Sequence, residues 1–331
     1  NVKKVVVASS RSIYGEGKYM SKELGAVYPK HRVAEDMDNG DFEPNYSNSS
    51  SLTLVATDED SKIHPSSVYG ITKQNQEQMV LTVCPTIGIA GVAFRYQNVY
   101  GPGQSLKNPY TGILSIFSTQ IKNGNGINIF EDGKESRDFV YIDDVVDATI
   151  LGIEKEEANN QVFNVGTGVA TDVITVANSL CKNYGVEVPI TISGNYRLGD
   201  IRHNFADLTK ISSTLGFEPK FSFEQGLQQF TDWVNTQEVQ EDKYQKSIDE
   251  MKAKRGVKQD VELTAEDLHE LAEQFKAEYK AKIGADFPTD PKEQLMGAIK
   301  AVFRSWDNPR ANVYRRDNDI PYSWGTAVNV Q

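Results

Sequence analysis

Runs of apolar residues spaced through the first half of the chain constrain its fold more than any other feature of the sequence. Residues 2–8 are apolar and β-branched and end in small polar residues, and residues 87–96 and 162–165 are similarly apolar. An unbroken apolar run suits a strand buried on both faces of a parallel sheet, because a half-exposed strand alternates apolar and polar residues. Segments of helical composition, such as 69–83 and 171–184, separate these runs. The alternation predicts an α/β fold built on a parallel sheet.

Weaker signals predict smaller elements between the main ones. Residues 33–64 are polar and rich in Asn and Ser, which predicts mainly loop. Short strands are predicted over 128–130 and 138–141. Residues 142–144 include two Asp side chains and offer an N-cap for a helix over 145–153, because Asp accepts hydrogen bonds from the free N–H groups of a first helical turn.

Composition and charge limit the classes of partner. A chain of 331 residues predicts about two domains, and its net charge of −11 argues against nucleic acid, which requires a concentrated basic surface. No apolar stretch approaches the roughly 20 residues of a membrane span, and the first residues show no signal pattern. Cys84 and Cys181 lie far apart without metal-ligand spacing. We therefore expect a cytoplasmic protein with no disulfide and no metal site.

A tyrosine and a lysine four residues apart give the chain a catalytic pattern. Tyr69 and Lys73 fall on one face of the predicted helix 69–83. Oxidation of a secondary alcohol by a nicotinamide needs a group that takes the hydroxyl proton as hydride leaves the carbon. Free tyrosine titrates near pH ~10, and a nearby ammonium favours its ionised form. A hydroxyl from the serine run 9–12 is placed to hydrogen-bond the reacting oxygen, although the same pair also occurs on solvated helix surfaces.

Other motifs accompany this pair in the order found in one known family. The serine run 9–12 is followed by Ile-Tyr-Gly at 13–15, and residues 95–103 follow the predicted helix. Together these motifs resemble the extended short-chain dehydrogenase/reductases, the nucleotide-sugar epimerases and dehydratases. The resemblance covers residues 1–250. It implies a partial Rossmann-like parallel sheet with a small substrate-binding subdomain, NAD as cofactor, a nucleotide sugar as partner, and in some members a homodimer.

The resemblance also implies roles for individual residues. The catalytic group would be Tyr69 as acid and base, with Lys73 tuning it and Ser10 assisting. The cofactor-binding positions would be Ser9, Tyr69, Lys73 and Tyr96. The substrate-binding positions would be Asn98, Arg137, Arg197 and Asp200. In this scheme both arginines hold the diphosphate, because a guanidinium donates two parallel hydrogen bonds to phosphate oxygens, and Asp200 binds a ribose hydroxyl. A surface ion pair is the alternative for both arginines.

The serine run favours one reaction within that family. The 4,6-dehydratases carry Thr-Asp-Glu there, because elimination of water needs an acid and a base beyond the tyrosine. This chain has Ser-Arg-Ser at 10–12, which favours epimerisation at C4 over dehydration. Residues 104–112 look most like the dTDP-L-rhamnose 4-epimerase subgroup.

The glycine-rich turn of the family is missing from this sequence. The family binds the NAD pyrophosphate at a Gly-rich turn between the first strand and its helix. No Gly-x-Gly-x-x-Gly opens a strand and helix unit here. The sequence thus resembles an N-terminally truncated member without its first strands, and we expect the chain to bind NAD weakly or not at all.

The last quarter of the chain has a helical pattern. Thr264 and Asp267 predict a capping box, and an apolar stripe follows until Gly284. Pro291 opens a second helix with its own stripe, and both stripes are predicted to be core. Residues 251–331 resemble part of the nucleotide-binding domain of pyruvate phosphate dikinase, without its phosphate-binding loop.

The two resemblances leave several hypotheses open. The first hypothesis is a nucleotide-sugar 4-epimerase. The alternatives are a related 4,6-dehydratase, an inactive chimera of two enzyme fragments, and an ATP-dependent phosphotransferase fragment. The last is the least supported, because no catalytic residue of the kinase family can be carried over to this sequence.

Overall fold

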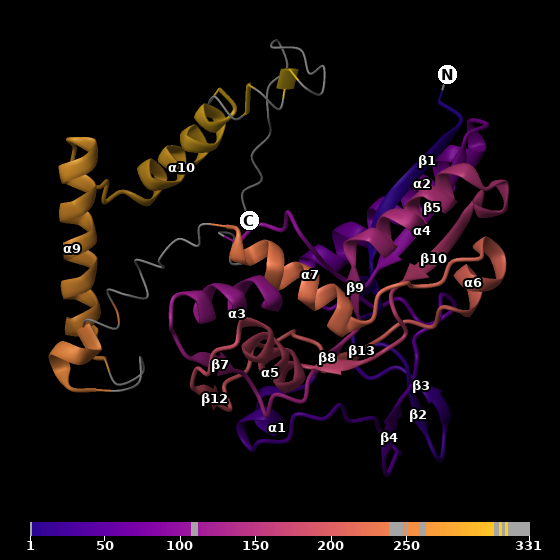
Figure 1. Ribbon diagram of the computed structural model, residues 1–331, viewed down its shortest axis with the longest axis horizontal. Coiled ribbons are helices and arrows are strands. Elements are labelled where there is room, and N and C mark those ends of the chain that lie inside the picture. Colours follow the sequence, from indigo (N-terminus) through magenta and orange to yellow (C-terminus); the bar gives the residue numbers. More distant parts are fainter. Residues whose placement is uncertain are drawn as a thin grey trace. The chain divides into compact units, whose positions relative to one another are not determined.

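The chain divides into two compact units. The computed structural model describes residues 2–106, 112–237, 248, 251–257, 263–307, 311–312 and 315–316. Unit 1 comprises Asn1–Gln240 and unit 2 comprises Glu241–Gln331 (Figure 1). The boundary expected at residue 250 lies ten residues after the observed division. Most of the motif at 104–112 and the end of the kinase-like segment lie outside the described residues.

A parallel sheet of three strands organises unit 1. Strands β1 (Lys4–Ser10), β5 (Ala90–Tyr96) and β10 (Gln161–Val165) lie in the order β1-β5-β10. Both pairings are parallel, and Tyr96 at the end of β5 is level with Ser10 of β1. The carboxyl ends of the three strands therefore meet at one edge. The predicted α/β fold with a parallel sheet is confirmed.

Helices cover both faces of this sheet because successive side chains of a strand point to opposite sides. Arg95 reaches Glu77 of helix α2 (Val68–Thr86) on one face. Phe94 points the other way, where Gly152 of helix α4 (Ile142–Glu154) leaves room for its ring. Residues of α4 and α6 (Thr209–Leu215) share a buried core with the strands on that second face.

The start of α4 differs from the sequence expectation. The helix begins at Ile142, and its N-cap residue Tyr141 makes no side-chain capping bond. The predicted cap within residues 142–144 is therefore wrong. The buried carboxylate of Asp144 instead accepts the backbone N–H groups of Lys220 and Phe221, at 2.9 and 3.2 Å. These two hydrogen bonds stabilise the backbone just before helix α7 (Phe223–Asn235). The sequence around Asp144 could not predict them, because their donors lie more than 70 residues further along the chain.

A second hydrophobic core lies in the other part of unit 1. Helices α3 (Ile113–Lys122), α5 (Val173–Tyr184) and α7 enclose it, with fully buried side chains such as Leu180 and Phe230. Short strands in this region are β6 (Asn98–Tyr100) paired with β9 (Phe139–Tyr141), β7 (Ile127–Ile129) paired with β12 (Ile190–Ile192), and β8 (Ser136–Arg137) between β11 (Thr171–Asp172) and β13 (His203–Asn204).

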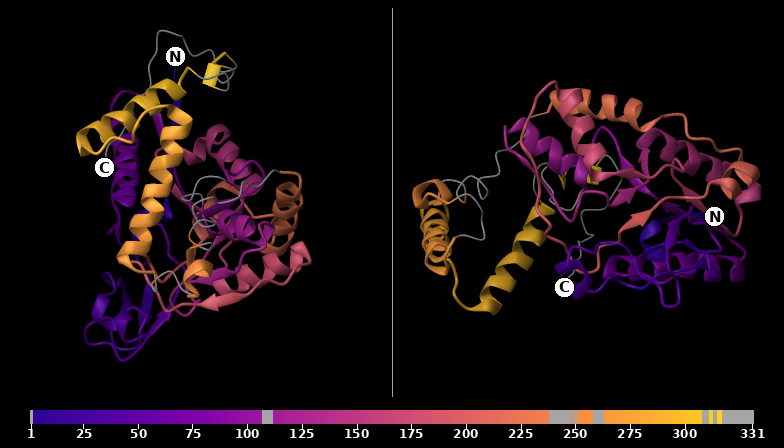
Figure 2. Two further views of the ribbon diagram at one scale, coloured as in Figure 1. Left: turned by 90° about the vertical axis from the view of Figure 1, so that its left-hand side faces the viewer. Right: turned by 90° about the horizontal axis from the view of Figure 1, so that it is seen from below.

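The segment predicted as loop contains two short elements. Helix α1 (Ala34–Asp38) and strand β4 (Leu52–Leu54) lie within residues 33–64, and the rest is irregular. Strand β4 pairs with β2 (Tyr19–Ser21), which also pairs with β3 (Gly25–Val27). This small sheet lies at the end of unit 1 away from the start of β1 (Figures 1 and 2).

Unit 2 contains the two predicted helices. In α9 (Ala265–Ile283), Thr264 and Asp267 form the predicted capping box, and Gly284 ends the helix in a left-handed conformation. Helix α10 (Pro291–Ser305) begins with Pro291 in its first turn. The expectation that both apolar stripes are core is wrong for α10, which buries no residue within the described part of the chain. Nothing among those residues of unit 2 covers its stripe.

No helix among the described residues combines the length and apolar character needed to cross a membrane.

Candidate functional site

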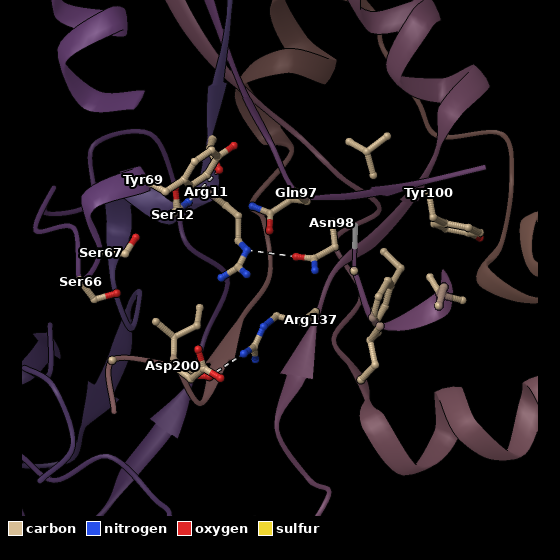
Figure 3. A pocket seen from close by; sticks show the side chains of 18 of the residues that line it. Arg11, Ser12, Ser66, Ser67, Tyr69, Gln97, Asn98, Tyr100, Arg137 and Asp200 are labelled. Atoms are coloured by element: carbon tan, nitrogen blue, oxygen red, sulfur yellow. Dashed lines mark hydrogen bonds between the residues drawn. The ribbon is translucent and has the colours of Figure 1, made fainter. Parts of the chain in front are cut away.

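A cavity of about 370 Å³ lies where β1 and β5 end (Figure 3). Since Ser10 and Tyr96 are level in the sheet, the residues that follow them also lie side by side. Arg11 donates from Nε to Oδ1 of Asn98 at 3.0 Å across this edge. The carboxyl ends of parallel strands are the usual ligand site of open α/β sheets.

A glycine brings α2 close enough to line this cavity. A Cβ on Gly70 would lie 2.7 Å from the backbone oxygen of Ser12, so only glycine allows this approach without a shift of the chain. Ser67 caps the helix by accepting the Gly70 N–H at 3.0 Å. Tyr69, between them in sequence, therefore faces the cavity next to the serine run.

The three predicted catalytic residues lie around the end of β1. Ser10 and Tyr69 line the cavity. Ser10 Oγ accepts the backbone N–H of Ser12 at 3.2 Å, which leaves its own O–H available to donate. Lys73 Nζ lies 5.8 Å from the centre of the Tyr69 ring and donates to Ala8 O at 2.9 Å. The structure thus places the hydroxyl, the phenol and the ammonium near one another.

The side chains at two predicted cofactor-binding positions, Ser9 and Tyr96, form hydrogen bonds with other side chains of the protein. Ser9 Oγ donates to Glu77 Oε2 at 2.6 Å and is buried. Tyr96 shares a 2.7 Å hydrogen bond between its hydroxyl and Thr149 Oγ1, and burial raises its pKa. Neither side chain lines the cavity, and a cofactor role for either stays a prediction.

Of the predicted substrate residues, Asn98, Arg137 and Asp200 line the cavity. Arg137 donates to the backbone oxygens of Ile201 and Arg202, at 2.6 and 2.9 Å, and burial lowers its pKa. These bonds fix the arginine beside Asp200 (Figure 3).

Arg197, the fourth predicted substrate-binding residue, does not lie at the cavity. Its guanidinium lies 5.0 Å from the centre of the Phe130 ring, and its side chain is exposed. It does not line the cavity. A diphosphate-binding role for Arg197 stays a prediction.

An ionic network holds the loop that carries Asp200. Arg202 is 1% exposed and contacts the carboxylates of Glu43 and Glu131 at 2.7 and 2.9 Å. Arg32 also contacts Glu131, at 2.8 Å, and donates to the backbone oxygen of Asp200 at 2.8 Å. Buried charges need such pairing, so the network fixes the backbone on one side of the cavity.

Three residues that line the cavity were not predicted as site residues from the sequence. The amide of Gln97 is buried, and neither its oxygen nor its nitrogen has a hydrogen-bond partner among the described residues. The same is true of Ser12 Oγ. Burial and the charge of Arg137 lower the pKa of Arg11 to about 9. The only signal in the sequence was the position of Arg11 and Ser12 inside the serine run, and Gln97 gave none.

Unit 1 is therefore a parallel α/β domain with a polar cavity at the carboxyl ends of its strands. Residues 44–166 match the family described as NAD dependent epimerase/dehydratase family. This segment is therefore similar to members of that family.

Known proteins extend the similarity over most of unit 1. A dTDP-L-rhamnose 4-epimerase of Burkholderia thailandensis is 34% identical over 234 residues, which cover 70% of this chain and 63% of that protein. The solved UDP-glucose 4-epimerase of Thermotoga maritima with UDP-glucose is 31% identical with a TM-score of 0.57, covering 71% of this chain and 64% of that one. The chain thus spans less than two thirds of the length of each.

About a third of the chain is similar to a different enzyme. Pyruvate, phosphate dikinase of Clostridium symbiosum is 59% identical over 117 residues, which cover 34% of this chain and 13% of that protein. This match is longer than the segment 251–331 to which the sequence motifs assigned the resemblance.

Among the described residues, the side chains beside the end of β1 have the chemistry to bind one end of an NAD molecule. Tyr69 and Lys73 lie there, and their phenol and ammonium groups can hydrogen-bond the hydroxyls of a ribose. The main strands lead into the short helix η1 (Arg11–Tyr14), into β6 and toward β11. None of these described connections is a Gly-x-Gly-x-x-Gly turn, so none provides the usual cradle for the pyrophosphate.

Proposed function

We propose that unit 1 carries the substrate site of an NAD-dependent nucleotide-sugar 4-epimerase, which acts at C4 of a nucleoside-diphosphate hexose. The observation that supports this most is one cavity lined by a serine hydroxyl, a tyrosine phenol and an arginine, from Ser10, Tyr69 and Arg137. NAD, when bound, supplies the reversible acceptance of hydride. The family match and the similarity to two 4-epimerases agree with this reaction.

In this proposal each residue of the chain has a defined task. Tyr69 takes the proton of the C4 hydroxyl and later returns it. Lys73 provides a positive charge 5.8 Å from the centre of that ring. Ser10 donates its O–H to the same sugar oxygen, since Ser10 Oγ only accepts in its bond with the Ser12 N–H and keeps its own proton to donate.

The cavity favours epimerisation over dehydration. Elimination of water needs an acid and a base besides the tyrosine. Asp200 is the only carboxylate among the described residues that line the cavity, and it comes from the loop at 199–201 and not from the serine run. Among epimerase substrates, we propose a dTDP-linked deoxyhexose of the L-rhamnose type, on the similarity to the Burkholderia protein.

The test is conversion of nucleotide sugars by the 331-residue chain with added NAD. Because we expect weak NAD binding, the assay uses NAD in large excess. Under that excess the proposal predicts that wild type interconverts a C4 epimer pair, measured by NMR of the sugar protons, with dTDP-L-rhamnose and UDP-glucose as substrates. Tyr69→Phe should lower the rate by at least about 100-fold while the nucleotide sugar still binds. Full activity of this variant would refute the role of Tyr69, and a wild-type chain that converts neither sugar would favour the alternative of an inactive chimera.

A further inference from the structure

The wholly or partly buried arginines of unit 1 divide into two groups. Arg32, Arg95 and Arg202 each contact a buried carboxylate at 2.6–2.9 Å. Arg11 and Arg137 differ, because no carboxylate lies within 4.0 Å of either guanidinium in the part of the chain that the structure describes. The two unpaired arginines are the two that line the cavity.

Arg11 points into the cavity from the first residue of η1. Its Nε donates to Asn98, and its terminal nitrogens have no hydrogen-bond partner among the described residues. Figure 3 shows this end of the side chain facing the cavity on the side of Arg137. The negative charge of Asp200 raises the pKa of Arg11, but the charged groups of the two side chains lie more than 4.0 Å apart and form no ion pair.

Two desolvated cations beside one cavity need an anion. Burial disfavours the charge of Arg11 most, and the charge of Arg137 adds to this, so the pKa of Arg11 is lowered to about 9. The hydroxyl groups of a sugar are neutral and do not offset two positive charges. A diphosphate offsets both, and its oxygens match the donor geometry of guanidinium groups.

We propose that Arg11 binds the diphosphate of the nucleotide sugar together with Arg137, and so fixes how deeply the sugar enters toward Ser10 and Tyr69. This inference rests on the proposed function in that it takes a nucleotide sugar as the ligand. It assigns a substrate-binding task to a side chain of the serine run, next to the catalytic hydroxyl. Asn98, which accepts the Arg11 Nε–H, holds the guanidinium in place.

Calorimetry on the 331-residue chain without NAD tests this proposal. The probes are UDP, UMP, UDP-glucose and UDP-glucuronic acid, and the variant is Arg11→Gln, which keeps side-chain length and a donor but loses the charge. We expect a loss of UDP and UDP-glucose affinity of about 10- to 100-fold, as for other hydrogen bonds to charged groups, and a smaller loss for UMP. Arg11→Lys should recover part of the loss.

Lys220→Gln is the matched control, because Lys220 is exposed, pairs with Asp147 and lies outside the cavity. It should leave all four affinities unchanged, and an unchanged melting temperature of Arg11→Gln excludes a folding defect. Equal UDP affinity in wild type and Arg11→Gln would overturn the proposal. A loss confined to UDP-glucuronic acid would also overturn it, since Arg11 would then bind a sugar carboxylate.

These outcomes separate the inference from the proposed function. If wild type binds UDP-glucose and Arg11→Gln does not, the inference holds even where Tyr69→Phe refutes the catalytic role. If wild type binds none of the probes, both fail.

Discussion

The two units use the same helical signals but bury their apolar residues differently. In unit 1, α5 and α7 are amphipathic, and Leu180 and Phe230 are fully buried. In unit 2, α10 is similarly amphipathic, yet Val302 and Phe303 are 42% and 46% exposed. The period of a stripe therefore predicts the helix and the face that would be buried. It does not predict that a partner surface is present, because that surface comes from residues distant in sequence.

The largest expected difference between the units concerns core packing. Phe163 in β10 is fully buried beside Phe94, at 6.0 Å between ring centres. Phe163→Ala should lower the free energy of unfolding of unit 1 by about 3–5 kcal/mol, from lost burial and the cavity left behind. Phe303→Ala in unit 2 should change stability by less than about 1 kcal/mol. Urea unfolding followed by circular dichroism measures both, and similar losses would show that a partner surface covers α10.

A smaller effect concerns a buried acid of unit 1. Glu135 is 14% exposed and lies 3.8 Å from Arg202, and burial raises its pKa to about 7. Its folded pKa lies above its unfolded value, so the folded state binds the proton more tightly. The stability from this group is fully present below pH ~4.5 and is lost as the pH rises through about 7.

Glu135→Gln should therefore make the free energy of unfolding depend less on pH between pH ~4.5 and about 7. Above pH ~7 it should raise the free energy of unfolding by on the order of 2 kcal/mol. Glu273→Gln in unit 2 is the control and should leave this pH range unchanged, because Glu273 is exposed and Lys276 lowers its pKa. Thermal melts from pH 5 to 8 give the profile, and an unaltered slope in Glu135→Gln would contradict the raised pKa.

The smallest expected effect concerns the glycines that end two helices, and the loss of stability on replacing them should be equal in the two units. Gly185 ends α5 with φ of 64° and Gly284 ends α9 with φ of 76°, and an added Cβ would meet no atom within 4 Å at either site. Alanine at each position should cost about 1 kcal/mol, because the left-handed conformation disfavours any residue with a Cβ. Amide hydrogen exchange of the preceding helix reports each change. A much larger cost at Gly185 would show that packing, and not the local backbone, decides the effect.

Local signals predicted more of the fold than of the site. The three strands of the parallel sheet, the capping box at Thr264 and the Gly284 stop depend on neighbouring residues, and the structure contains all of them. The predicted burial of the first strand is wrong, because β1 lies at the edge of the described three-stranded sheet and only Ser9 and Ser10 of it are buried. The helical spacing of Tyr69 and Lys73 is local as well, and the two side chains do lie near each other. Their catalytic roles remain predictions.

The site differs from the sequence interpretation where distant segments meet. Arg197 resembled a diphosphate ligand but lies over Phe130, outside the cavity. Asp144 was expected in a helix cap and instead binds the backbone before α7. The sequence interpretation used Arg11 only as evidence against dehydration, because an acidic residue stands at its position in the dehydratases. In the structure Arg11 lines the cavity together with Arg137.

The sequence by itself determined the strands, the helices and their ends, because hydrophobic period, capping and glycine conformation act within a few residues. It also determined which chemistry the chain can present, since the phenol, ammonium and guanidinium groups are its own side chains. Only the tertiary structure decided which arginines have carboxylate partners and which face the cavity unpaired. Desolvation and charge pairing depend on groups that lie more than a hundred residues apart in the chain, such as Arg11 and Arg137, and they become neighbours only when the parallel strands align.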